Sequence, residues 1–449
     1  MTTAEHRAPV GPRIYNLFPT LLGPVPNWHQ RLPAIAEMGF DWIFLNPVHL
    51  PGVSGSLYSI KDPSRLNPKL RPQHQAQRRQ SDDALLRDFC AAARKAGIRV
   101  MLDLVINHSA KDSVLVDTHP EWFARDADGH VRSPFVRDLD NPDQVTVWED
   151  LAELDYSERP AREAMLRYWE DLIGGYLDLG FGGFRCDAAY KLPGSVWRRL
   201  IATARKRDPA ASFFAETLGA PEEAVEQLRG AGFDFLFNSS KWWDFRAGWL
   251  LEQYQRFRDL APSIAFPESH DTERLAAESG GSVQESRFRY LFAAVFSAGV
   301  MLPIGYEFGF RRPLHVVETT PEDWEQGLAE SPFDISAYIA RVNAMKAATP
   351  VLCEEGPQER VTDPNAPLVG LLRRSTQGPQ RSLALINPDP HHTHNHGVQQ
   401  LSDTLGCAPV DIREITPAID TDAETPPESL ANRNDIQVPP RSLRVFIKR

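Results

Sequence analysis

The sequence has no excess of basic residues. Its 449 residues include 49 Lys and Arg against 60 Asp and Glu, for a net charge of -11. A chain with this balance has no positive field to attract phosphate backbones or anionic lipid. We therefore expect neither nucleic acid nor a membrane surface as a partner, and the composition leaves the oligomeric state open.

Cysteines and long apolar runs are also scarce. The four cysteines lie far apart without the spacing of a metal site, which favours free thiols over a disulfide framework. The longest apolar stretch, residues 291–306, is broken by Gly299 and Pro303. The first residues, MTTAEHRAPVGPR, lack the apolar core of a secretory signal. These absences predict a soluble, cytoplasmic protein.

The sequence does contain short apolar runs that alternate with helical stretches such as 82–96, 159–179 and 194–207. Each run is too apolar to have one face in water, which is typical of parallel strands covered by helices. An α/β fold of the (β/α)8 TIM-barrel type is therefore predicted. The eight expected strands are 14–18, 42–48, 99–107, 183–188, 213–218, 233–238, 263–269 and 301–307.

Two segments depart from this regular spacing. Residues 109–156, rich in Asp, Pro and Trp, are loop-like and predict a small domain inserted after the third strand. The catalytic barrel then comprises residues 1–108 and 157–349. Beyond an amphipathic stretch at 334–348, runs such as RSLALINP and SLRVFIKR predict a C-terminal antiparallel β-sandwich domain at 350–449. Its histidine tract, 391–396, is expected to be a solvated hairpin loop rather than a metal site.

The stretch GGFRCDAAYKL, residues 182–192, places two charges in a buried strand. Alternate strand residues face opposite ways, so Arg185 and Asp187 share one side. Glu216 and Asp271 also close apolar runs, 29 and then a further 55 residues along the chain. One such acid alone is more often a helix N-cap or a solvated residue. Three acids at barrel strand ends predict a shared cleft at the C-terminal rim, where such enzymes keep their active sites.

The surroundings of the acids suggest different roles. Arg185 beside Asp187 would keep that carboxylate ionised, as a nucleophile requires. Glu216 follows two phenylalanines and an alanine, and an apolar setting raises a carboxyl pKa, as a general acid requires. Two carboxyl groups with these roles, roughly 5 to 5.5 Å apart, make a retaining glycosidase site.

At this point the sequence resembles the α-amylase superfamily, glycoside hydrolase family 13. The resemblance covers residues 13 to about 310 and rests on four ordered motifs and a fifth stretch that closes strand eight. One motif alone would be weak, but all of them in order at these spacings are highly specific. They are DLVINH (103–108), GFRCDA (183–188), FFAET (213–217), ESHD (268–271) and PIGYEFG (303–309).

The resemblance implies a role for each acid. Asp187 is implied to be the nucleophile that forms a β-glycosyl enzyme, with Arg185 positioning it. Glu216 is implied to be the general acid and then the base. Asp271 is implied to bind hydroxyls of the distorted sugar and so to stabilise the transition state.

Four further residues are implied to bind substrate. His108 and His270 would donate to hydroxyls of the reacting sugar, and Tyr58 would stack on its apolar face. Structural histidines and loop packing are the alternatives. Many α-amylases have a Lys-His pair that contacts the acceptor side, whereas this chain has Tyr190 and Lys191 there. Lys191 is the candidate at this position, and acceptor recognition is expected to differ.

A calcium ion is frequent in the family. It would use Asn107 together with carboxylates of the inserted domain, such as Asp138, Asp140 or Asp143. Nothing in their spacing forces a site and many relatives lack the ion, so no cofactor is expected to be required. The RDADGH segment, 125–130, faintly suggests a calcium loop but is better explained as a polar turn.

The reaction itself follows from which acceptor reaches the glycosyl enzyme. Our first interpretation is an enzyme that hydrolyses or rearranges α-1,4-linked glucans or maltooligosaccharides. The alternative is an α-glucan glycosyltransferase or phosphorylase, because HPEWF (119–123) and the Lys191 position resemble maltosyltransferases that use maltose 1-phosphate. A catalytically silent binding or scaffold member is a third interpretation. In KWWDFR, Trp242 or Trp243 could contact outer sugar rings or pack in the core.

Overall fold

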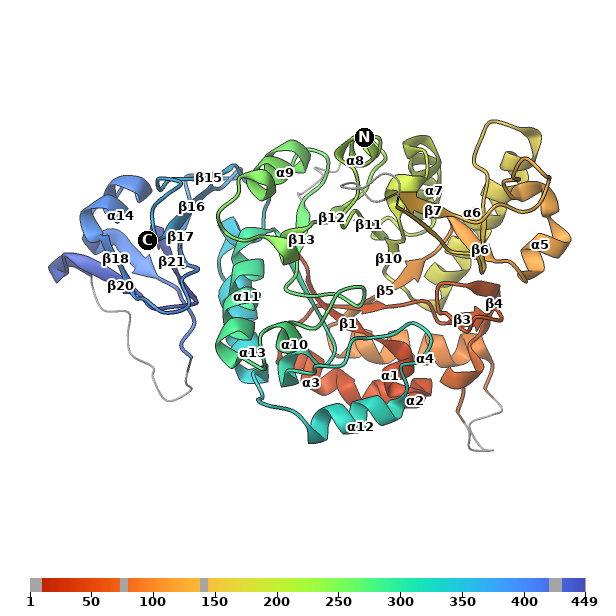
Figure 1. Ribbon diagram of the computed structural model, residues 1–449, viewed down its shortest axis with the longest axis horizontal. Coiled ribbons are helices and arrows are strands. Elements are labelled where there is room, and N and C mark those ends of the chain that lie inside the picture. The colour runs from red at the N-terminus through yellow and green to blue at the C-terminus, as the bar shows by residue number, and fades with distance from the viewer. Residues whose placement is uncertain (1–9, 73–79, 138–143, 420–429, 449) are drawn as a thin grey trace.

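The computed structural model describes residues 10–72, 80–137, 144–419 and 430–448 (Figure 1). Eight parallel strands close into a barrel in sequence order, which confirms the predicted (β/α)8 fold. Each strand ends one to four residues before its predicted end, because the apolar residues continue into the rim loops. The strands are β1 (Arg13–Leu17), β2 (Trp42–Leu45), β5 (Arg99–Leu104), β10 (Gly183–Cys186), β11 (Ser212–Glu216), β12 (Phe235–Phe237), β13 (Ser263–Ala265) and β14 (Gly299–Pro303).

Helices cover the outside of the barrel (Figure 1). The helix α4 (Asp82–Lys95) shows why these segments are helical. Ser81 caps its first turn by accepting the Ala84 N–H, two acids begin it and two bases end it. The other helices around the barrel are α1 (Pro19–Leu22), α2 (Val25–Trp28), α3 (Leu32–Glu37), α6 (Pro160–Leu179), α7 (Gly194–Arg207), α8 (Glu222–Glu226), α9 (Trp249–Phe257), α10 (Leu275–Glu278), α11 (Val283–Phe296), α12 (Pro321–Ala329) and α13 (Ser336–Ala347).

Two apolar cores lie on the two sides of the barrel wall. The inner core is rich in phenylalanine and contains Phe44, Phe214 and Phe237. The outer core lies between strands and helices and contains Phe184 and Cys186 of β10. Arg185, between these two residues in the sequence, therefore points into the barrel, as the predicted alternation requires.

The described residues of the inserted segment, 109–137 and 144–156, include small antiparallel pairs on one side of the barrel, at the right of Figure 1. The strand β6 (His108–Ala110) pairs with β9 (Leu151–Glu153), and β7 (Phe135–Arg137) pairs with β8 (Val145–Val147). The helix α5 (Val114–Thr118) lies between β6 and β7 in the chain. A third pair, β3 (His49–Pro51) with β4 (Ile60–Leu66), belongs to the loop after β2.

The C-terminal part is a five-stranded antiparallel sheet in the order β15-β16-β17-β21-β19. One face belongs to the outer core of the barrel through residues such as Leu371, Ile386 and Val445. The opposite face forms a separate core with α14 and the β18–β20 pair. The elements are β15 (Gln358–Arg360), β16 (Val369–Arg374), β17 (Arg381–Asn387), β18 (His394–Gly397), α14 (Val398–Leu405), β19 (Ile412–Glu414), β20 (Asp435–Val438) and β21 (Ser442–Lys448).

The histidine tract is only partly a loop. His394 and His396 belong to β18, which pairs with β20, so the expected hairpin loop is wrong for this half of the tract. His392 and His394 both contact the Asp389 carboxylate, at 3.1 and 3.2 Å. The four cysteines are free thiols, as expected. Among the described residues, no helix is both long and apolar enough to cross a membrane.

Candidate active site

The three predicted acids lie together around one buried arginine. Arg185 donates through Nη1 to Oδ1 of Asp187 at 2.8 Å. Its Nη2 lies 3.8 Å from Oε2 of Glu216 and 4.0 Å from Oδ2 of Asp271. The same Nη1 donates to both carboxylate oxygens of Asp103, at 2.9 and 3.0 Å. One cation thus faces four carboxyl groups, which come from the ends of β5, β10 and β11 and from the loop after β13.

Asp187 is held at both carboxylate oxygens. Arg185 binds Oδ1, and the Asn107 amide donates to Oδ2 at 3.2 Å. The next residue, Ala188, has a left-handed conformation with φ +39°, which is uncommon for a residue with a Cβ. This turn directs the Ala188 N–H to Oε2 of Glu216 at 2.7 Å. The loop after β10 therefore fixes both carboxyl groups at once.

Glu216 is a carboxyl group in an apolar setting. Burial raises the pKa of Glu216 to about 7, the charges of Asp187 and Asp271 add to this effect, and Arg185 opposes it. This is the direction that its position after two phenylalanines predicted. A carboxyl group with this pKa is present in both protonation states near neutral pH and can give or take a proton.

Tyr58 joins a hydrogen-bonded network behind the acids. Its hydroxyl donates to Oδ2 of Asp103 at 2.7 Å, accepts from the Asn46 amide at 3.0 Å, and lies 2.7 Å from Nε2 of His270. The rings of Tyr58 and His270 are parallel, with centroids 5.8 Å apart. Loop packing alone therefore does not account for Tyr58.

The same network fixes the state of His270. Nε2 also lies 3.1 Å from Oδ2 of Asp271, and burial lowers the pKa of His270, so the ring is neutral. We assign the proton to Nε2, because the Tyr58 oxygen and the Asp271 carboxylate both accept a hydrogen bond there. Nδ1 is buried and has no partner among the described residues.

Sequence reasoning assigned no role to Asp103 or Asn46. Asp103 lies beside Arg185 in the register of β5 and β10, and burial raises its pKa to about 8. An acid within the apolar run of β5 is as conspicuous in the sequence as Arg185 in β10, so Asp103 could have been found in the same way. Asn46 directly follows β2 and gave no comparable signal.

His108 and Lys191 both make contacts within the protein. Nε2 of His108 lies 3.1 Å from the Tyr58 carbonyl oxygen, so this nitrogen is already engaged. Lys191 donates to the Phe135 carbonyl at 3.1 Å, and its ammonium lies 5.2 Å from the centroid of the Trp148 ring. Lys191 therefore connects the loop after β10 to the inserted segment.

Three of the acids, with Tyr58, His108 and Lys191, are among the residues that line a cleft of about 320 Å³. It opens between the loop after β2, the inserted segment and the strand ends. Four of the lining residues are acidic, and Lys191 is the only Lys or Arg among the lining residues described. The cleft is lined by Ser56, Tyr58, Asn107, His108, Pro134, Trp148, Asp150, Leu151, Asp187, Ala188, Tyr190, Lys191, Glu216, Asp271 and Val316.

A calcium site finds limited support in the described residues. The Oδ1 of Asn107 is buried and has no hydrogen-bond partner in the described part of the chain, which leaves it available as one ligand. Calcium takes six to eight oxygens, and the other candidates, Asp138, Asp140 and Asp143, lie outside the described residues. The ion therefore stays an expectation drawn from the resemblance.

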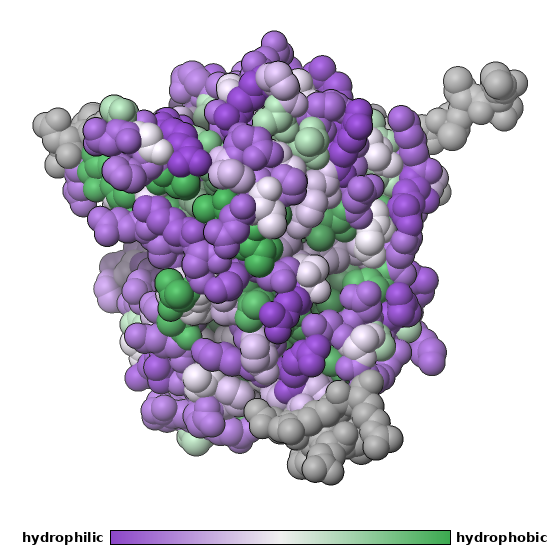
Figure 2. Space-filling model, turned by 90° about the vertical axis from the view of Figure 1, so that its right-hand side faces the viewer, coloured by the Kyte–Doolittle hydropathy of each residue, from purple (hydrophilic) through white to green (hydrophobic). Residues whose placement is uncertain are grey.

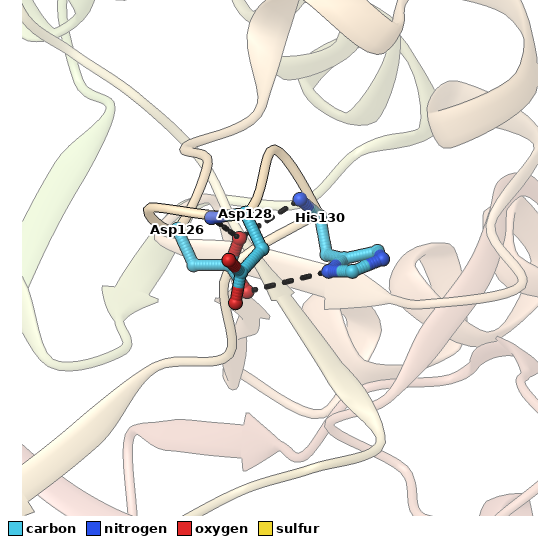
Figure 3. Close-up of side chains that lie close together, drawn as sticks. All are labelled: Asp126, Asp128 and His130. Atoms are coloured by element: carbon cyan, nitrogen blue, oxygen red, sulfur yellow. Dashed lines mark hydrogen bonds and ion pairs between the residues drawn. The ribbon is translucent and has the colours of Figure 1, made fainter.

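The RDADGH segment is a polar turn, as expected (Figure 3). Oδ1 of Asp126 accepts the backbone N–H groups of Asp128 and His130, at 3.0 and 2.9 Å. The three side chains are exposed, although their potential ligand atoms lie within 4.8 Å of one another. The turn accounts for these contacts without an ion.

The two neighbouring tryptophans after β12 have different environments. Trp243 is buried in the outer core, and its Nε1 donates to the Ala247 carbonyl. Trp242 is 53% exposed at the rim, next to Gly219. Of the two, Trp243 is therefore the core residue.

The raised pKa of Glu216 predicts how the stability of the protein depends on pH. Its folded pKa of about 7 exceeds the usual value of 4.5, so the native state loses stability as pH rises from 4.5 to 7. The Glu216→Gln variant has no titrating carboxyl group at this position and so does not lose this stability. Above pH 7 we expect its free energy of unfolding to exceed that of the parent by up to about 3 kcal/mol. Urea unfolding of both proteins at pH 5 and pH 8 measures the difference. Glu325→Gln on an exposed helix face is the control, and an equal gain for Glu216→Gln at both pH values would contradict the prediction.

Comparison with known proteins finds relatives that match most of the chain. Residues 12–137 match a family model described as glycogen debranching enzyme, glucanotransferase domain. An α-1,4-glucan:maltose-1-phosphate maltosyltransferase of Burkholderia pseudomallei is 28% identical over 86% of this chain and 34% of its own length. The corresponding protein of Myxococcus xanthus is 24% identical over 86% of this chain and 59% of its own length. The α-amylase MalA of Haloarcula japonica is 26% identical over 74% of this chain and 49% of its own length.

The chain thus spans between about a third and three fifths of the length of these relatives. Among solved structures, an α-amylase from Lactobacillus plantarum superposes with a TM-score of 0.73 at 20% identity, covering 98% of this chain and 99% of the other. An α-amylase from Geobacillus thermoleovorans gives a TM-score of 0.72 at 15% identity, covering 98% of each. With the ordered motifs and the closed barrel, these similarities support the resemblance of the chain to the α-amylase superfamily, glycoside hydrolase family 13.

Proposed function

We propose that the chain is a retaining glycosidase that acts on α-1,4-linked glucans or maltooligosaccharides. The observation that carries the proposal is the placement of Asp187 and Glu216 within 4 Å of the Arg185 guanidinium, one carboxylate held by two donors and the other buried. Closely spaced carboxyl groups with divided roles suit a double-displacement mechanism.

In the first step, the Asp187 carboxylate attacks the anomeric carbon of the sugar. The bond to the glycosidic oxygen breaks, and the protonated Glu216 gives its proton to that oxygen, so the leaving sugar departs as an alcohol. The product on the enzyme is a β-glycosyl ester of Asp187. Arg185 and Asn107 keep the attacking carboxylate oriented while its charge is consumed.

In the second step, the Glu216 carboxylate takes a proton from water or from a sugar hydroxyl. The oxygen of that acceptor attacks the anomeric carbon and displaces Asp187, which restores the α configuration. Asp271, half exposed beside His270, is positioned to accept hydroxyls of the reacting sugar. Tyr58 and His108 line the same cleft and would contact that sugar.

Transfer from maltose 1-phosphate is the second candidate, because relatives with that name cover most of this chain. The charge of the cleft favours a neutral substrate. Its described lining has four acids, Asp150, Asp187, Glu216 and Asp271, and only Lys191 against them. A phosphate dianion there would be repelled. The silent binding interpretation ranks third, because all the acids that the motif requires are present.

Product analysis tests the proposal. The protein is incubated with maltoheptaose, with and without inorganic phosphate, and in parallel with maltose 1-phosphate and a glucan acceptor. We expect shorter maltooligosaccharides, or redistributed chain lengths, with new reducing ends in the α configuration by NMR and a rate that phosphate does not change. Release of phosphate from maltose 1-phosphate with chain elongation would replace the first candidate by the second. No product from any α-glucoside would refute both.

A further inference from the structure

Trp148 is an aromatic residue of the inserted segment that lines the cleft. It follows β8 directly and is 39% exposed. Its backbone is fixed, because its N–H donates to the Pro134 carbonyl and its own carbonyl accepts from Leu151. Exposure of part of an indole ring to water in a polar cleft is unfavourable unless a ligand covers the ring.

Exposed large hydrophobic residues are concentrated around Trp148. Of the thirteen exposed large hydrophobic residues in the described chain, five lie within residues 135–148. The molecular face that includes the inserted segment is largely hydrophilic with several hydrophobic patches (Figure 2). The apolar face of a sugar ring is a suitable cover for such a surface next to a glycosidase cleft. The five residues are Phe135, Val136, Val145, Val147 and Trp148.

Lys191 holds this wall of the cleft in place. Its ammonium lies 5.2 Å from the centroid of the Trp148 ring, within the range of a cation-π contact, and donates to the Phe135 carbonyl. The ammonium therefore makes both of these contacts with the inserted segment. It is therefore poorly placed to bind a charged acceptor.

The contacts of Trp148 relate it to Glu216, which protonates the departing oxygen in the proposed mechanism. Lys191, whose ammonium contacts the Trp148 ring, belongs to the loop after β10, and the Ala188 N–H of that loop donates to Oε2 of Glu216. Tyr58, in contrast, donates to Asp103 and lies 2.7 Å from Nε2 of His270, which is next to Asp271, the acid proposed to bind the sugar that becomes attached to the enzyme. These contacts favour different sides of the reacting bond for Trp148 and Tyr58.

We propose that Trp148, positioned by Lys191, binds the sugar ring on the leaving-group side of the scissile bond by stacking on its apolar face. This inference rests on the proposed function and adds the acceptor site to it. The ligand is a neutral glucosyl unit, which either departs in the first step or enters as acceptor in the second. Lys191 is a positioning residue here, because it acts through the Trp148 ring.

Two substrates distinguish binding of the leaving-group sugar by Trp148 from a general effect of the residue on catalysis or folding. Maltoheptaose places sugars on both sides of the scissile bond, whereas α-maltosyl fluoride has only fluoride on the leaving-group side. We expect Trp148→Ala to lower kcat/KM for maltoheptaose by about 10- to 50-fold, since each tenfold corresponds to about 1.4 kcal/mol of lost binding in the transition state. We expect kcat/KM for α-maltosyl fluoride to stay within about twofold, which also shows that the variant is folded.

Matched variants complete the test. Trp148→Phe keeps an aromatic plane and is expected to retain most activity on maltoheptaose. Val114→Ala, at an exposed apolar residue of the inserted segment outside this surface and outside the cleft lining, is expected to match the parent on both substrates. Lys191→Met is expected to give a smaller loss than Trp148→Ala, and the double variant no more than Trp148→Ala alone, because the two residues act as one unit.

The outcomes are distinct. Equal losses on both substrates, or no loss on either, would overturn the role of Trp148 while leaving the proposed function intact. Additive losses in the double variant would overturn the positioning role of Lys191. A parent protein that cleaves neither substrate would refute the proposed function itself and this inference with it.

Discussion

The Asp187→Ala variant is expected to lose hydrolysis of maltoheptaose by about 10⁴-fold or more, because no glycosyl enzyme can form. The substitution also leaves a space in which Arg185 and Asn107 keep two donors without their acceptor. A small anion fits such a space. With α-maltosyl fluoride and azide, we therefore expect recovery of turnover, with azide attacking the anomeric carbon directly and fluoride leaving.

The configuration of the rescued product identifies the role. Direct attack in the Asp187→Ala variant inverts the centre and gives β-maltosyl azide, which NMR distinguishes from the α anomer. Asp126→Ala, on the exposed turn of the inserted segment, is the control and should match the parent. Retention of more than about one hundredth of the parent activity in Asp187→Ala would show that another group is the nucleophile.

The Glu216→Gln variant is expected to lose about 10³-fold in kcat/KM on maltoheptaose, within the range of a lost general acid. The loss should be much smaller for α-maltosyl fluoride, because fluoride leaves without a proton. The glycosyl enzyme then accumulates for lack of a base, and azide should release α-maltosyl azide from it. This product has the opposite configuration to that from Asp187→Ala, so exchanged roles of the two acids would exchange the products.

The pH profile offers a second measurement on Glu216. The general acid must be protonated in the free enzyme, and its pKa is raised to about 7, so the parent kcat/KM on maltoheptaose should fall as pH rises above about 7. The Glu216→Gln variant should lack this decline. A parent profile that stays flat to pH 9 would contradict the assignment of Glu216 as the acid.

Much of the site was accessible from the sequence because barrel strands are apolar on both sides. A charge within or at the end of such a run is conspicuous, which is how Arg185, Asp187, Glu216 and Asp271 were found. The structure brings all four together, as strand order in a barrel requires. The strand ends were less predictable, since apolar residues beyond each strand pack the rim.

The features that the sequence did not predict depend on the register of the strands and on long loops. Asp103 pairs with Arg185 because β5 and β10 align these two residues, and no single sequence states that register. Trp148 meets Lys191 across 43 positions, through a segment whose short strands have little periodicity. The histidine tract was expected to be a loop because it lies between two strand candidates, and the four residues of β18 are too few to show a strand pattern of their own.

The shared core between barrel and C-terminal sheet has a consequence for how the protein is made. Leu443 and Val445 of β21 belong to the same core as the barrel helices, and β21 lies between β17 and β19 in the sheet. During synthesis from the N-terminus, the proposed catalytic residues are all present long before residue 442 leaves the ribosome. The strands β16 and β17 can cover part of the barrel earlier, but the sheet lacks the strand between β17 and β19 until β21 has emerged. The barrel is therefore fully covered by this sheet only after residues 442–448 have been synthesised.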